Sequence, residues 1–403
     1  MTSWPRSGMY KGYPISRLLP GVRPFHGFLA SAPEDFVDFM QSAIGEPFVG
    51  LTTDGQLRPN VYPDGPTGIS TQPIVDAADA FLATIDQLDY RLYVQQPFDS
   101  WHRRSWFNAA PVIMPAGVLL DDMRPEQRQA AMAIVEKCLS PSGYVLVRQS
   151  MLVNQAMGEI FNFYTDTFRE WAVWFTIFGQ PSTDQPWGWQ LMGTHIDINC
   201  TIVGDRMSLE PLFLGAEISE VDEGRYQGLS VYAPEQNAGI ALGQTLTGKQ
   251  RDRTILYPSM RNADLPPELS GFIDGRHIGG AGRDNAVVPY AGVCAADFTH
   301  EQRALLLDLI DIYMSRLTAD RQRLRMAEIS RYVDEIHVSY IGEPTKVPFY
   351  YRIHGPTVWI EFDHHPGLMF EGAEEPIQYH IHTITRAPNG GDYGSTYVAQ
   401  HQK

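Results

Sequence analysis

The sequence predicts an α+β fold, in which a helical N-terminal part packs on a largely antiparallel sheet built from residues ~186–232 and ~335–386. Two observations lead to this prediction. Apolar residues recur at three- and four-residue spacing through the first 180 residues, whereas period-two alternation begins near Pro186. The predicted elements also run in the order helices, strands, helices, strands, unlike the strict strand–helix alternation of a parallel doubly wound sheet.

The same change of pattern divides the chain into two parts. We expect a mainly helical part over residues 1–180 and a mixed α/β part over residues 181–403, which carries the functional site. The length of 403 residues allows two or three domains, and one compact domain overall is the alternative.

Helices are predicted wherever the apolar spacing follows the helical period. In the first part they cover residues 35–44, 72–88, 125–139 and 148–177, and in the second part residues 234–247 and 298–326. In the last of these, Thr299 and Gln302 fit a capping box, which marks the helix start.

Strands are predicted from alternation rich in β-branched and aromatic residues. They cover residues 187–204, 206–214, 338–340, 348–354, 358–364 and 378–385. The first two form a hairpin around Gly204–Asp205, and Gly355–Thr357 forms a tight turn between two later strands. Residues 251–290 are rich in loops and show no clear periodicity.

Charge and composition exclude several classes of protein. The chain has 31 Lys and Arg against 47 Asp and Glu, a net charge of −16, and no basic stretch longer than residues 321–325. We therefore expect neither nucleic-acid nor membrane partners, since both favour basic surfaces. No run reaches 18 apolar residues, and residues 1–23 lack the apolar core of a signal peptide, so we expect a cytoplasmic protein.

Common catalytic signatures are not found in the sequence. It contains no GxSxG, HExxH or P-loop motif, and no GxGxxG after a strand. The three cysteines, Cys138, Cys200 and Cys294, are widely spaced and suggest neither a zinc ribbon nor a disulfide framework. Any metal ion must therefore be bound by histidines and carboxylates.

Histidines are concentrated near the C-terminus, where five of the twelve lie between His354 and His382. Residues two apart on a strand share a face, so His380 and His382 lie about 7 Å apart on the same side. Three imidazoles with an open position are typical of a catalytic metal site. We predict His364, His380 and His382 as ligands of a divalent ion.

Several neighbours are candidates for supporting roles at this site. His195 and His354 are each predicted as a fourth ligand or proton shuttle. Asp363 and Glu361, which share a face of one strand, are candidates for orienting a ligand imidazole or for acting as general base. The structural alternative is a polar sheet face with His–carboxylate pairs.

A turn-rich loop, residues 387–394, follows the last predicted strand. Arg386 either binds a substrate carboxylate or pairs with Asp392. Asp392 and Tyr393 are either turn caps or catalytic residues, and we keep all three as catalytic candidates.

The function predicted from these residues is a metal-dependent enzyme of hydrolase or lyase type, acting on a small organic substrate. Zinc is favoured, because it would lower the pKa of bound water towards ~7. One alternative is an oxidoreductase with histidine-bound iron or copper, and another is a non-catalytic small-molecule binding protein. The sequence allows a homo-oligomer and does not determine the oligomeric state.

Several segments resemble domain-of-unknown-function family 3500, in the same order over roughly Thr71 to the C-terminus. They are WGWQLMGTHIDIN, RDNAVVPY, RMAEI, FYYRIHGPTVWIEFDHH and HIHTITRAPNGGDYG. The family is functionally uncharacterised, so the resemblance implies relatives and motif residues but no reaction. The motif residues it implies are His195, His354, His364, His380, His382, Arg386, Asn389, Asp392 and Tyr393.

The chain departs from the family pattern at three places. His365 falls outside the pattern, and the family usually has His-His where this chain has Thr194-His195, which leaves His195 as the better candidate there. Many relatives resemble exported proteins, whereas this chain begins without a signal segment.

Overall fold

The computed structural model confirms the α+β class. It describes residues 34–85, 88–109, 115–161, 168–270, 276–367 and 375–402. The helices are α1 Glu34–Gly45, α2 Gln72–Ala83, α3 Leu88–Val94, α4 Pro125–Cys138, α5 Pro141–Phe161, α6 Ala233–Thr245, α7 Gly248–Thr254, α8 His300–Met314, α9 Ala319–Ser330 and α10 Ser395–His401. The strands are β1 Gln95–Gln96, β2 Val118–Leu119, β3 Val173–Phe178, β4 Trp187–Gly193, β5 Ile196–Val203, β6 Arg206–Ser208, β7 Leu212–Ala216, β8 Ile255–Tyr257, β9 Val293–Cys294, β10 His337–Ile341, β11 Tyr350–His354, β12 Trp359–Pro366 and β13 Pro376–Arg386.

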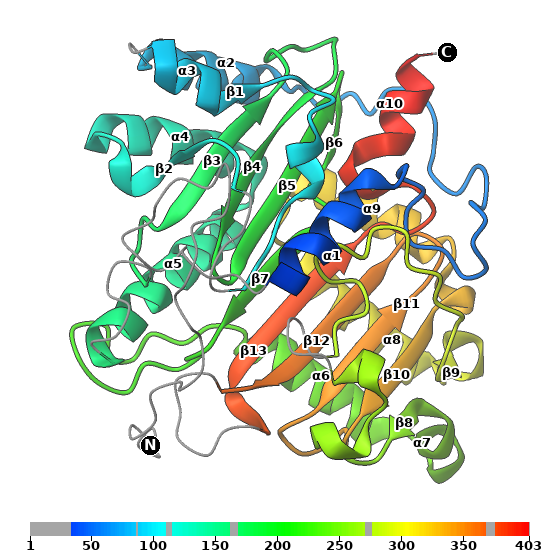
Figure 1. Ribbon diagram of the computed structural model, residues 1–403. Coiled ribbons are helices and arrows are strands. Elements are labelled where there is room, and N and C mark those ends of the chain that lie inside the picture. Colours follow the sequence, from blue (N-terminus) through cyan, green and yellow to red (C-terminus); the bar gives the residue numbers. More distant parts are fainter. Residues whose placement is uncertain are drawn as a thin grey trace.

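Within these described ranges the strands form one 13-stranded sheet. Its order is β1-β3-β4-β5-β7-β13-β12-β11-β10-β8, with β2 on β3, β6 on β5 and β9 on β10. Neighbours are antiparallel except for the pairs β1–β3 and β8–β10. The two groups of strands predicted from the sequence meet in the middle of this sheet, where β7 pairs with β13 (Figure 1).

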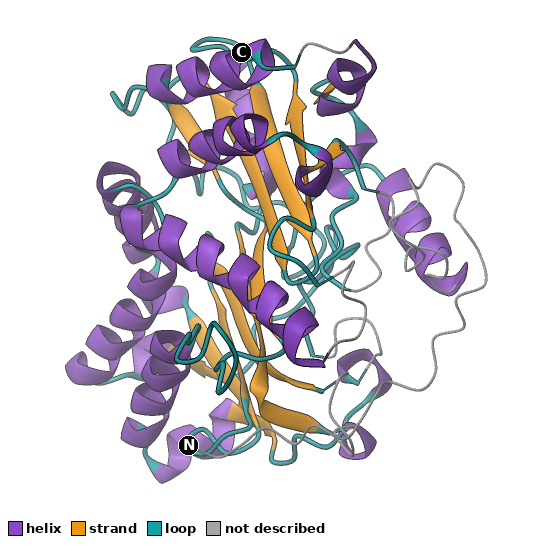
Figure 2. Cartoon of the chain, turned by 90° about the vertical axis from the view of Figure 1, so that its left-hand side faces the viewer, coloured by secondary structure: helices purple, strands orange, loops and turns teal. Residues whose placement is uncertain are grey.

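The two faces of the sheet are covered differently. Long helices pack on one face (Figure 2), and the main hydrophobic core there includes Phe81 of α2, Ile134 of α4 and Leu309 of α8. On the other face α1 and long loops cross the sheet (Figure 1), and a smaller core joins Met40 of α1 to Phe213 of β7. Polar groups on this second face therefore lie under loops rather than under helices.

One long predicted helix is wrong in its second half. The prediction covered residues 148–177, but α5 ends at Phe161 and β3 follows at Val173–Phe178, with all six residues buried. A strand covered on both faces shows no alternation, and a short apolar run does not by itself distinguish strand from helix. Residues 162–167 of that prediction, and residues 86–87 of the predicted helix 72–88, lie outside the described residues.

Two other predicted elements are divided by turns. The predicted strand 187–204 is the hairpin of β4 and β5, and the predicted helix 298–326 is α8 followed by α9. The capping box is confirmed, because the Thr299 hydroxyl accepts the backbone N–H of Gln302 at 3.2 Å while the Gln302 side chain accepts that of Thr299 at 2.9 Å. The predicted strand 206–214 is interrupted at residues 209–211, so it forms two strands, β6 and β7, and both pair with β5.

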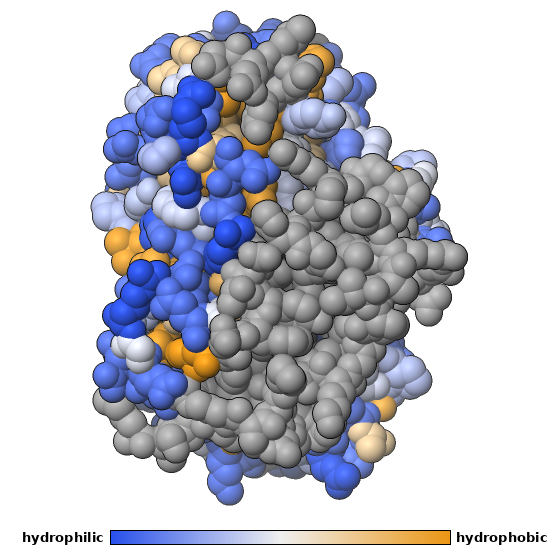
Figure 3. All heavy atoms as spheres, turned by 60° about the vertical axis from the view of Figure 1, so that its left-hand side comes forward, coloured by the Kyte–Doolittle hydropathy of each residue, from blue (hydrophilic) through white to orange (hydrophobic). Residues whose placement is uncertain are grey.

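The surface shows mainly hydrophilic side chains among the described residues on the face in Figure 3, with small hydrophobic groups between them. Over the part of the chain that the structure describes, no helix combines the length and apolar character needed to cross a membrane.

Candidate metal centre

Three histidines converge on the loop-covered face of the sheet where β7 meets β13. The Nε2 atom of His380 lies 3.0 Å from Nε2 of His195 and 2.9 Å from Nε2 of His382. One ligand atom from each ring lies within 4.8 Å of the other two, and all three residues are buried. The arrangement brings three nitrogen donors to one point.

His195 reaches this point from the two-residue turn between β4 and β5. Its φ of 63° is in the left-handed region, which is uncommon for residues other than glycine. The turn is tied down on both sides: the His195 N–H donates to the Asn108 carbonyl at 2.9 Å, and the His195 carbonyl accepts the Gly215 N–H at 2.8 Å. The Asn154 side chain also donates to the Thr194 carbonyl at 2.8 Å.

Gly215 on β7 leaves the space that two of these rings occupy. A Cβ atom at this position would lie 3.0 Å from Cδ2 of His382 and 3.3 Å from Cδ2 of His195. Both distances are shorter than an ordinary van der Waals contact, so glycine allows the sheet to approach the rings.

The three imidazoles have the protonation state that metal binding requires. Burial lowers the pKa of His195 to about 3, and it also lowers the pKa of His380 and of His382 well below the ordinary value. The three imidazoles are therefore neutral at pH 7, which is the form that binds metals.

The second ring nitrogen of His380 has the partner that a metal ligand requires. Its Nδ1 lies 2.6 Å from the Pro366 carbonyl oxygen, which accepts the Nδ1 proton. The tautomer with a lone pair on Nε2 follows from this bond. Hydrogen bonds of this kind fix the orientation of metal-bound histidines.

A fourth histidine, His365, packs against two of them, His380 and His382. Its ring stacks on His382 with centroids 4.4 Å apart, and its Nδ1 lies 3.2 Å from the Asp363 carboxylate. Asp363 also pairs with the buried guanidinium of Arg276 at 3.5 Å. Burial alone would raise the pKa of Asp363, but Arg276 and His365 lower it below its ordinary value.

A fifth histidine, His277, faces the same group from the loop after residue 276. Its ring centroid lies 5.8 Å from that of His382 at an interplanar angle of 90°, and both rings pack on Phe213. His277 belongs to no recognisable sequence motif and was not among the predicted site residues. His365 lies outside the family pattern, although its position two residues after Asp363 was a usable signal.

The predicted ligand His364 lies on the opposite, helix-covered face of the sheet. One ring nitrogen lies 2.8 Å from the Phe349 carbonyl oxygen and the other 2.9 Å from the Gln236 side chain of α6. The ring also packs on Phe349 and Phe362. The structure therefore brings His195, and not His364, together with His380 and His382.

His354 and Glu361 lie on the same face of the sheet as the three histidines but do not join them. His354 pairs with Trp359 of β12, which in turn pairs with Arg386 of β13. Arg386 is four residues from His382 along β13, a distance of about 13 Å. Glu361 accepts four hydrogen bonds, which satisfy both of its oxygens. Its donors are the backbone of Ile278 and Gly279 and the side chains of Tyr350 and Trp359.

The predicted catalytic residues Arg386, Asp392 and Tyr393 form a separate buried network. Arg386 donates to Asp392 at 2.8 Å and to Asp284 at 2.6 Å, and Tyr393 donates to Asp284 at 3.0 Å. Burial would lower the pKa of Arg386, but the two carboxylates raise it above its ordinary value. Of the two alternatives for Arg386, the structure shows the pairing with Asp392. It does not bring Arg386, Asp392 or Tyr393 to the three histidines.

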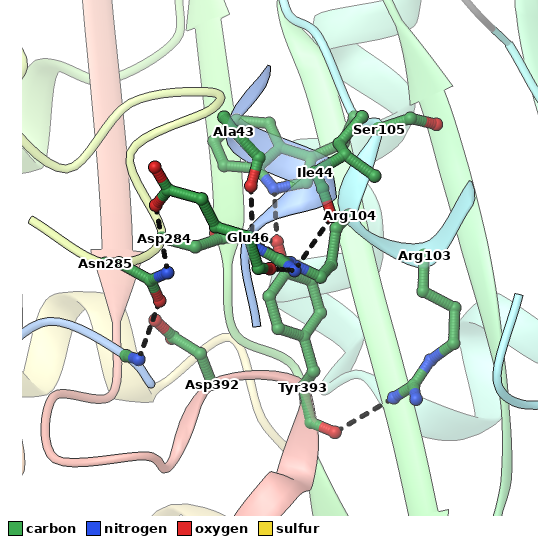
Figure 4. A network of polar contacts seen from close by, with 12 residues as sticks. Ala43, Ile44, Glu46, Arg103, Arg104, Ser105, Asp284, Asn285, Asp392 and Tyr393 are labelled. Atoms are coloured by element: carbon green, nitrogen blue, oxygen red, sulfur yellow. Dashed lines mark hydrogen bonds and ion pairs between the residues drawn. The ribbon is translucent and has the colours of Figure 1, made fainter. Parts of the chain in front are cut away.

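The same network extends to α1 through Arg104 (Figure 4). Arg104 donates to Asp284 at 2.8 Å and to the carbonyls of Ala43 and Glu46, near the C-terminal end of α1. A cation there is stabilised by the free carbonyls of the last turn. The network thus joins α1, β13 and the loop around Asp284 structurally.

The chemistry available at the three histidines follows from their number and type. Imidazole suits zinc, copper, iron and nickel, whereas the carboxylate of the common non-haem iron triad is absent from this group of described residues. Three protein ligands leave a coordination position open, which is typical of catalytic rather than structural zinc sites.

Comparisons with known proteins identify relatives without a described reaction. A family described as "Protein of unknown function (DUF3500)" matches residues 67–395. No curated protein and no solved structure matches the chain.

Proposed function

This chain belongs to the DUF3500 family, and we propose that it is a metal-dependent enzyme of hydrolase or lyase type acting on a small organic substrate. His195, His380 and His382 are the proposed ligands of one divalent ion, with zinc favoured. The observation that carries this proposal is the convergence of three Nε2 atoms from two separate segments of chain.

Burial of this convergence point supports a functional role. Imidazoles that merely fill a core are satisfied by their own hydrogen bonds, as His364 is. Here the three nitrogens face one another, and the His195 turn is tied down by three backbone or side-chain hydrogen bonds. An arrangement of this kind is pre-organised to bind an ion.

Different described residues would orient the ligands of such a site and exclude water from it. A zinc ion bound here would supply Lewis acidity and a water of lowered pKa. The Pro366 carbonyl and the stacked ring of His365 orient His380 and His382. The covering loops exclude water, since none of the three ligand residues is more than 5% exposed.

A second candidate function is an oxidoreductase that uses copper. The specific observation is that the converging group contains three neutral nitrogen donors and no carboxylate, a set that copper also accepts. A non-catalytic binding protein is the remaining outcome, and it requires no ion at all.

Elemental analysis of the purified full-length protein tests the proposal. We expect one divalent ion per chain, and loss of that ion in the double variant His380→Ala/His382→Ala. The matched control is His364→Gln, a buried histidine of the same sheet on its other face, which should retain the ion. The identity of the ion distinguishes zinc from copper.

Unchanged ion content in the double variant would contradict the proposed ligands. If the wild type carries its ion, a panel of small esters, amides and carboxylic acids then tests for turnover. An ion without turnover on any panel member, but with ligand binding unaffected by chelators, would favour the non-catalytic reading.

A further inference from the structure

His277 is a buried histidine whose ring has no hydrogen-bond partner within the described part of the chain. Its side chain is 0% exposed, and neither ring nitrogen has a partner among the described residues. An imidazole needs one donor and one acceptor interaction when neutral. Leaving such groups unsatisfied inside a protein lowers its stability.

The neighbours of His277 explain how the ring stays in this position. Arg276, immediately before it, donates to the Met260 carbonyl and to the Asn262 side chain. Ile278 and Gly279, immediately after it, donate their backbone N–H groups to the Glu361 carboxylate, each at 2.8 Å. The backbone on both sides holds the ring, so its own polar atoms are left available.

The position of His277 suggests what those atoms face. The ring lies against His382 and Phe213, but its nitrogens are not part of the group whose ligand atoms lie within 4.8 Å of one another. His277 is therefore beside the proposed ion rather than one of its ligands. Because its ring packs on that of the proposed ligand His382, a molecule bound to the ion on this side would lie beside His277.

Charge balance indicates the chemical class of that occupant. Three neutral imidazoles leave the 2+ charge of a divalent ion uncompensated, and a buried charge without a counter-charge is strongly unfavourable. The buried carboxylates near the three histidines are already engaged: Asp363 with Arg276 and His365, Glu361 with four hydrogen-bond donors, and Asp197 with a partner of its own. An anion from solution would supply the missing negative charge.

We propose that this site binds a small oxyanion of the carboxylate class next to His195, His380 and His382, and that a ring nitrogen of His277 donates a hydrogen bond to it. The inference rests on the metal site proposed above and deepens it by naming the substrate class. One further donor atom on the same face, Nε of Arg276, also has no hydrogen-bond partner in the described parts of the chain.

Acetate binding to the cobalt(II)-loaded full chain tests the inference, because the visible spectrum of cobalt reports both its ligands and added anions. We expect acetate to change the spectrum of the wild type. His277→Phe keeps a ring of similar shape and should weaken acetate binding about 10- to 100-fold, as expected for a lost hydrogen bond to a charged group. One cobalt per chain should remain.

Two further variants complete the experiment. His277→Gln keeps a polar side chain and serves if the phenylalanine variant does not fold. His364→Gln, on the other face of the sheet, should bind both cobalt and acetate like the wild type. Formate in place of acetate tests whether the carboxylate group alone is recognised.

Each other result would overturn the inference in a distinguishable way. Unchanged acetate affinity in both His277 variants removes His277 from the anion site while leaving the metal site intact. Loss of cobalt in those variants makes His277 a metal ligand. A wild type that binds no cobalt removes the proposed metal site and this inference together.

Discussion

Strand β13 buries polar residues at its C-terminal end and in its middle to a similar degree but satisfies them differently. At the C-terminal end, called the arginine end here, Arg386 is 0% exposed and is paired with Asp392 and Asp284. At the histidine site in the middle, His380 and His382 are 1% and 3% exposed and direct their Nε2 atoms at each other. Close beside them, both nitrogens of His277 have no partner in the described chain.

This difference separates a structural network from a candidate functional site. A buried network in which every charge is paired stabilises one arrangement of the chain. Buried groups left unsatisfied cost stability and persist where they have another role. The comparison supports a structural role for Arg386, Asp392 and Tyr393 and supports the proposed ion-binding role of the histidines, and each prediction below tests one side of it.

The largest expected effect is at the arginine end. Asp392→Ala removes one of the two carboxylates that pair with Arg386 and should lower the free energy of unfolding by about 3 kcal/mol, because a buried cation loses a partner. Denaturant titration measures it. Asp320→Ala, which breaks the exposed pair with Arg323, is the matched control and should cost less than about 1 kcal/mol. Equal losses in the two variants would contradict the comparison.

The next effect is the stabilisation of the histidine site by its ion. Zinc at about 100 times its dissociation constant should raise the free energy of unfolding by about 2.7 kcal/mol, because it binds the folded chain. Thermal melts with and without zinc measure the gain. His380→Ala/His382→Ala should show no gain, whereas Asp392→Ala should keep all of it. A gain that survives in the histidine variant would place the ion elsewhere.

A smaller effect is the loss of stability in acid that the buried His364 causes, on the face of the sheet opposite the proposed ion. Burial lowers the pKa of His364 to about 4, so the unfolded chain takes up its proton first as the pH falls below about 6.5. Stability is then full above pH 6.5 and decreases towards pH 4, by about 2 kcal/mol at pH 5. Metal-free wild type should lose this amount more than His364→Gln between pH 7 and pH 5. Parallel curves for the two proteins would show that His364 does not titrate as expected.

The smallest effect is expected at Tyr393. Its hydroxyl donates to Asp284 at 3.0 Å and accepts the Trp106 indole N–H at 2.8 Å. Tyr393→Phe should cost about 1 kcal/mol in denaturant titration, the typical contribution of a hydrogen bond. Zinc content and any turnover should be unchanged. Loss of turnover at full zinc content would return Tyr393 to the catalytic residues.

Local pattern was enough to predict much of the strand structure. The two-residue spacing correctly placed His380 and His382 on one face of β13. On β12 it placed Glu361 and Asp363 on one face, and Phe362 and His364 on the other face. The spacing did not reveal which face of β12 lies on the same side of the sheet as His380 and His382. The strand register, which pairs Asp363 with His382, determines this. The same register brings His365 to the site and keeps His364 away from it.

The remaining site residues come from segments that no local rule connects. His195 is in a turn that the alternation of residues 187–204 did not reveal, because both strands flanking it are buried on each face. His277 comes from the loop-rich region 251–290, and only the hydrogen bonds of its neighbours to Glu361 and Met260 place it near His382.

The sequence by itself determined the α+β class, the family and the concentration of histidines on the last strands, because these depend on composition and on residue spacing within single elements. Only the tertiary structure decided which imidazoles meet and which arginine is committed to carboxylates. The physical reason is that strand register, turn geometry and burial are set by contacts between residues far apart in the chain, such as His195 with His380 and Arg386 with Asp284.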